Sequence, residues 1–219
     1  MKNVLQYEHK KLTPGEQQYI DDTVKHANKN NFTVHLIQKR SVTSGDGAKV
    51  NGFLSDDARM LAVATGKPKS KWFSTFLHES CHMDQSIEQA QVWKDLTIDG
   101  QDATDLVFMW LNHTVELNRR QLNKYTYRSA MVELDCERRS AKKIVKYGFD
   151  INVKEYTQRA NAYVYFYLVM RRTRKWYTIG KEPYNVKSVW SEMPDDFDNN
   201  YTRLPAKYAK LYERFCYGK

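Results

Sequence analysis

Two histidines with a glutamate between them form the clearest chemical pattern in the chain. Residues 78–82 read His-Glu-Ser-Cys-His, which places His78 and His82 four positions apart and Glu79 directly after the first. At 3.6 residues per turn, both imidazoles lie on one face of a helix and can reach one zinc ion. Glu79 then flanks the metal without binding it, in the position of a general base.

Two imidazoles leave zinc short of protein ligands, so a third ligand is expected elsewhere. Residues 83–90 contain no histidine. Further along, Glu133 and Glu137 stand four positions apart, which places their carboxylates on one helix face. Cys81 and Cys136 are close to these residues in sequence, but each points about 100° away from the ligand face. A thiolate binds zinc well, so either cysteine is a possible third ligand, but we expect both thiols to pack between helices.

The pattern resembles the gluzincin family of zinc metallopeptidases, in which an HExxH helix precedes a helix with the pattern Glu-x-x-x-Asp. The resemblance implies that His78, His82 and Glu133 bind zinc and that Glu137 hydrogen-bonds a histidine ligand. The family often has aspartate where Glu137 stands, so Glu137 remains the alternative ligand. The resemblance also implies hydrolysis of peptide bonds in a peptide or protein substrate, with Glu79 taking a proton from water.

The elements that must position these residues are a small sheet followed by helices. Apolar residues have helical spacing over 14–28, alternate with polar ones over 32–38, and form two short strand-like runs over 52–65. From residue 71 onward the spacing becomes helical. We expect a loop around 99–100 and helices over 72–90, 102–124, 129–147, 153–172 and 206–215.

These elements predict an α+β, mostly helical fold, with a small N-terminal β-sheet packed on an HExxH helix and a glutamate helix. Length favours a single metallopeptidase-like domain over residues 1–219. In gluzincins an edge strand aligns the peptide substrate, and residues 52–65 match that position. The resemblance covers about 32–147, and we expect 148–219 to be a helical extension and an irregular tail.

Composition limits the compartment and the partners. Three cysteines are too few for a disulfide framework, and no stretch approaches the roughly 20 apolar residues of a membrane-spanning helix. The first residues lack a secretory pattern, so we expect a cytoplasmic protein without membrane contact. The net charge of +9 attracts acidic partners in general and allows weak nucleic-acid contact.

Two other classes of function stay open. A basic nucleic-acid-associated or partner-binding protein could hold a non-catalytic zinc ion, and Glu79 would then be dispensable. An accessory protein of phage or mobile-element type could bind partners without cleaving them. A peptidase would also need a donor for the oxyanion, for which Tyr163, Tyr165 and His113 are candidates.

Overall fold

The computed structural model describes residues 2–217, and their contacts divide the chain into two compact units. Unit 1 holds the described residues up to Ala90 together with Lys142–Asp150, and unit 2 holds Gln91–Ala141 together with those from Ile151 onward. The fold is α+β and mostly helical, as the sequence predicts. The single domain expected from length stays a prediction, and each unit is described by itself.

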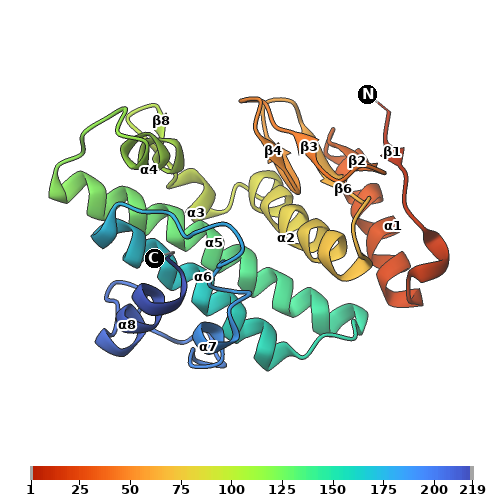
Figure 1. Cartoon of the computed structure of the whole chain (residues 1–219). Coiled ribbons are helices and arrows are strands. Elements are labelled where there is room, and N and C mark those ends of the chain that lie inside the picture. The colour runs from red at the N-terminus through yellow and green to blue at the C-terminus, as the bar shows by residue number, and fades with distance from the viewer. Residues whose placement is uncertain (1, 218–219) are drawn as a thin grey trace. The chain divides into compact units, whose positions relative to one another are not determined.

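A four-stranded mixed sheet forms one layer of unit 1 (Figure 1). Its order is β1-β2-β6-β5, where β1, β2 and β6 are parallel and β5 runs antiparallel to β6 at one end. A separate hairpin pairs β3 with β4. The bounds are Val4–Leu5 for β1, Thr33–Ile37 for β2, Val42–Thr43 for β3, Lys49–Val50 for β4, Gly52–Ser55 for β5 and Met60–Ala64 for β6.

The strands expected over 32–38 and 52–65 are therefore confirmed. β1 was not expected, because two residues are too short to show an alternating pattern.

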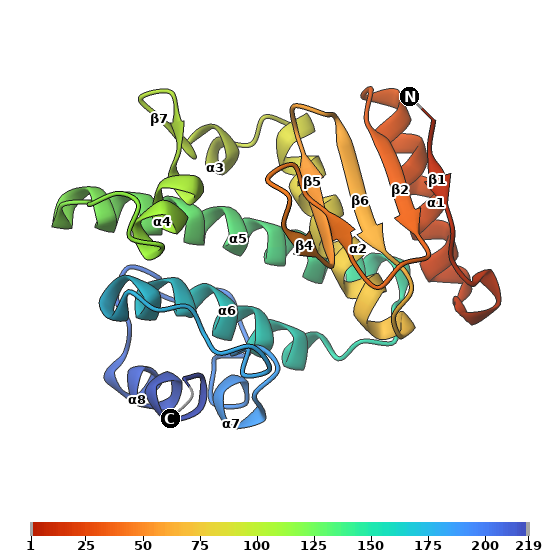
Figure 2. The same cartoon turned by 45° about the horizontal axis from the view of Figure 1, so that its top comes forward.

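Helices α1 (Pro14–Lys29) and α2 (Lys69–Ile87) cover the same face of this sheet (Figure 2). Val34 and Leu36 of β2 lie opposite Leu61 and Val63 of β6, and all four side chains are fully buried. Gly52 of β5 is paired with Val63 and faces α2, where a Cβ would come within 2.7 Å of the Thr75 side chain. The missing side chain thus lets α2 pack closely over the edge strand.

Local sequence signals explain where the two helices of unit 1 begin. Thr13 and Glu16 form a capping box at the start of α1, and Pro14 occupies the first turn, where its missing N–H costs nothing. Helix α2 begins at Lys69 after Pro68, three residues before the expected start. A short 3-10 helix over His9–Lys11 precedes α1.

Unit 2 is helical around an aromatic-rich core. Its long helices are α5 (Arg119–Tyr147), whose last residues from Lys142 belong to unit 1, and α6 (Val153–Thr173). The shorter elements are α3 (Gln91–Lys94), β7 (Thr97–Ile98), β8 (Gln101–Asp102), α4 (Ala103–Leu111), α7 (Lys187–Trp190) and α8 (Ala206–Phe215).

Two expected boundaries in unit 2 are wrong. The helix expected over 102–124 ends at Leu111, because the chain turns through His113 with a φ of 59°. The helix expected from 129 begins at Arg119, where Asn118 and Gln121 cap each other's backbone N–H groups. The loop expected at 99–100 is the turn of the β7–β8 hairpin. Within the described residues, no helix is both long and apolar enough to cross a bilayer.

Candidate metal centre

His78 and His82 converge on one point beside α2. Their Nε2 atoms lie 3.1 Å apart, and the two rings are nearly perpendicular, with an interplanar angle of 84°. A zinc ion bonded to both nitrogens at about 2.0–2.1 Å would then subtend an N–Zn–N angle of roughly 100°, close to the tetrahedral value. The spacing of the two nitrogens is therefore compatible with binding of one zinc ion in place of the hydrogen bond that now joins them.

Gln85 determines which nitrogen of His82 is free to bind a metal. The Oε1 atom of Gln85 accepts a hydrogen bond from Nδ1 of His82 over 2.8 Å, and Gln85 is fully buried. A proton on Nδ1 leaves the lone pair of a neutral imidazole on Nε2, the atom that faces His78. This is the usual arrangement behind a histidine ligand, in which the second ring nitrogen donates to a neighbouring oxygen.

Glu79 carries the one carboxylate of the motif at residues 78–82. Its side chain is half-buried, and it makes no hydrogen bond or ion pair within the described part of the chain. A carboxylate without a competing partner can take up a proton from water, as a general base must.

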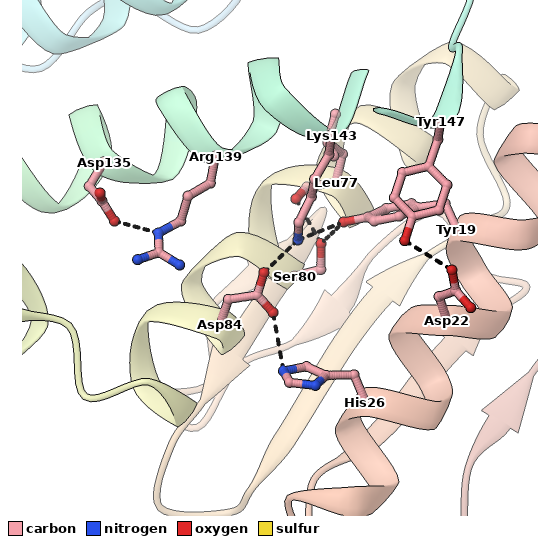
Figure 3. Close-up of polar contacts among 10 residues, drawn as sticks. All are labelled: Tyr19, Asp22, His26, Leu77, Ser80, Asp84, Asp135, Arg139, Lys143 and Tyr147. Carbon is pink, nitrogen blue, oxygen red and sulfur yellow. Dashed lines mark hydrogen bonds and ion pairs between the residues drawn. The ribbon is translucent and has the colours of Figure 1, made fainter. Parts of the chain in front are cut away.

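A chain of hydrogen bonds fixes α2 against α1 and the end of α5 in unit 1 (Figure 3). Nζ of Lys143 donates to the Tyr19 hydroxyl over 3.1 Å, and the hydroxyls of Tyr19 and Ser80 are hydrogen-bonded. Ser80 in turn donates to the carbonyl of Leu77 over 2.8 Å. Because Ser80 lies between the two histidines in sequence, this chain holds the histidine-bearing turn of α2 in one orientation.

Asp84 supplies the charge that makes this buried lysine tolerable. Its Oδ2 lies 2.7 Å from Nζ of Lys143, and its Oδ1 lies 3.6 Å from Nε2 of His26. Burial alone would lower the pKa of Lys143, but the neighbouring Tyr19, Cys81 and Asp84 together outweigh it, so the pKa stands well above its ordinary value. Burial raises the pKa of the Tyr19 hydroxyl, which therefore stays neutral and can donate to Ser80.

Glu133 and Glu137 lie on α5 in unit 2, where tyrosines of α6 contact them. Glu137 is buried and accepts a short hydrogen bond from the Tyr156 hydroxyl. Glu133 accepts a hydrogen bond from the Tyr167 hydroxyl over 3.5 Å.

The remaining candidates from the sequence have separate environments. The side chains of Cys81 and Cys136 are both fully buried, and neither forms a disulfide within residues 2–217. The Tyr165 ring packs on other tyrosines of unit 2, and burial raises its pKa to about 12. The hydroxyls of Tyr163 and Tyr167 lie 3.4 Å apart. The side chain of His113 is exposed in the turn after α4.

Sequence reasoning missed three residues that orient the predicted ligands. Gln85 follows His82 by three positions, and a polar residue one helical turn after a histidine could have indicated it. Tyr156 and Tyr167 gave no signal, because nothing in the sequence pairs α6 with the carboxylates of α5. Comparison of the chain with protein-family models, curated proteins and solved structures finds no match.

Proposed function

We propose that the chain is a zinc-dependent peptidase in which His78 and His82 bind the metal, Glu133 completes the protein ligands and Glu79 is the general base. The observation that carries the proposal is the 3.1 Å separation of the two Nε2 atoms, together with the Gln85 contact that directs the lone pair of His82 toward the shared point.

The arrangement of unit 1 supports a gluzincin-like architecture. The antiparallel strand β5 ends the sheet and packs beside the helix that carries the histidines. An edge strand offers unpaired backbone groups to which an extended peptide can add as a further strand. This is the role that the resemblance assigns to the edge strand in gluzincins, and it gives a peptide substrate a place near Glu79.

The chemistry divides between the metal and one carboxylate. Zinc bound here would polarise the scissile carbonyl and lower the pKa of a water molecule. Glu79 accepts the proton of the attacking water and passes it to the departing amine, so that the nitrogen leaves as a neutral group. Loss of Glu79 should therefore abolish turnover while leaving the metal ligands intact.

Glu133 is proposed as the third ligand because it is the first glutamate of the Glu-x-x-x-Glu pattern. This is the position of the zinc ligand in the family that the pattern resembles. Glu137 and the thiol of Cys136 are the alternatives that substitution can separate.

The test combines zinc analysis with cleavage of an unstructured peptide. We expect about one zinc per chain in the wild type, with Glu79→Gln retaining the metal and losing cleavage, and His78→Ala losing both. Glu8→Gln, an exposed carboxylate change in the same unit, is the matched control and should change neither. Equal loss of zinc in Glu79→Gln and His78→Ala would contradict the assigned roles, and zinc without cleavage in the wild type would favour the non-catalytic alternative.

A further inference from the structure

Three arginines of unit 2 meet around one open pocket of about 430 Å³. Arg119 comes from the first turn of α5, and Arg171 and Arg172 come from the last turn of α6. The pocket is also lined by three leucines, Leu122, Leu168 and Leu204. No aspartate or glutamate lines it among residues 2–217.

The charges of these arginines are poorly compensated. Arg119 and Arg171 form no ion pair within the described chain, and Arg172 has only a distant one, 3.8 Å from Glu213 between two exposed side chains. Burial lowers the pKa of Arg171, and the nearby positive charge of Arg119 lowers it further. Bringing like charges together in this way costs free energy that no carboxylate of the pocket offsets.

Helix dipoles explain only part of this arrangement. Arg171 and Arg172 lie at the carboxyl end of α6, where cations interact favourably with the dipole. Arg119 lies at the amino end of α5, where a cation is unfavourable, and the first turn of α5 contains no acidic residue. An anion in the pocket would offset the positive charge of the three arginines together.

We infer that this arginine pocket binds a phosphate group. Guanidinium groups offer paired N–H donors that match the oxygens of a phosphate, and three of them suit a doubly charged tetrahedral anion better than a single carboxylate. The pocket is open and partly apolar, so a phosphate attached to a larger molecule can enter it. The inference rests on unit 2 alone and does not depend on the zinc site.

The experiment measures binding of inorganic phosphate and of a short single-stranded oligonucleotide by calorimetry at constant ionic strength. It uses the full chain carrying His78→Ala, which removes the proposed zinc site as a competing anion site. Arg119→Gln and Arg171→Gln should each weaken binding about tenfold. Arg120→Gln removes the same charge from the next residue, which does not line the pocket, and should change binding less than about twofold.

The two ligands separate the source of the phosphate. If inorganic phosphate binds as tightly as the oligonucleotide or more tightly, the ligand is a small phosphorylated molecule. If the oligonucleotide binds much more tightly, and Arg119→Gln weakens its binding about tenfold, the ligand is a nucleic-acid backbone. Equal weakening by Arg119→Gln and Arg120→Gln would overturn the inference, because it would show diffuse attraction to a basic surface. Binding of neither ligand would overturn it as well. Arg119 is exposed, so its variant should fold normally, which thermal unfolding checks.

Discussion

Replacing Gln85 by methionine gives the sharpest test of how unit 1 would hold a metal. Methionine has nearly the same length and shape as glutamine but cannot accept the hydrogen bond from Nδ1 of His82. Both residues are buried, with His82 only 9% exposed and Gln85 at 0%, so water cannot replace the lost acceptor. The substitution therefore removes the 2.8 Å contact between Oε1 of Gln85 and Nδ1 of His82.

The size of the effect follows from the tautomers of His82. Without metal, the ring in Gln85→Met can move its proton to Nε2 and donate it to His78, 3.1 Å away. Zinc at Nε2 forces the proton back to Nδ1, where it is left buried without an acceptor. An unsatisfied buried donor costs about 1–3 kcal/mol, so zinc affinity should fall roughly 5- to 150-fold.

The assay is a competition titration of zinc against a chelator, together with urea unfolding of the metal-free protein. Gln85→Glu places a carboxylate at the same position and should bind zinc at least as tightly as the wild type, because a charged acceptor strengthens the hydrogen bond. Gln91→Met, an exposed change of the same kind, is the control. A folded Gln85→Met protein that binds zinc within twofold of the wild type would refute the assignment of the His82 tautomer.

Three further predictions test other parts of the argument. In the same competition titration, the loss of zinc affinity in Glu133→Ala should be at least about 10-fold larger than the loss in Glu137→Ala. The reverse order would exchange the roles of the two glutamates. Asp84→Asn and Lys143→Met should each destabilise the protein by about 3 kcal/mol in urea unfolding, because each leaves a largely buried charge without its partner. The double variant should lose less stability than either single variant. Additive losses would show that the two side chains do not stabilise each other. Burial holds the pKa of Tyr212 well above its ordinary value of 10.0. The stability that comes from burying the neutral hydroxyl is therefore complete below about pH 10 and is lost as pH rises through the raised pKa. Unfolding compared at about pH 9 and pH 11, with tyrosinate absorbance, checks this, and equal stability at both would contradict it.

Helical periodicity made part of the candidate site readable from the sequence. His78, Glu79 and His82 are placed by the geometry of one helix, so their spacing alone predicts that two imidazoles share a face. The strands β2, β5 and β6 were predictable for a similar reason, because their apolar runs have to bury one face of a sheet.

The partners of these side chains depended on how distant segments meet. Lys143 reaches Asp84 and Tyr19 from far along the chain, and the tyrosines of α6 reach the carboxylates of α5 only after two helices have packed. Such contacts carry no repeat in the sequence, since they depend on the path of the chain and not on the period of one element.

The sequence by itself determined the spacing of the histidine pair, the place of the proposed general base and the fold class, because helix and strand periods are local properties of the backbone. The tertiary structure decided the tautomer of His82, the burial of Lys143 beside Asp84 and the meeting of Arg119 with Arg171. These depend on which side chains exclude water from one another, and that is settled only when separate elements pack together.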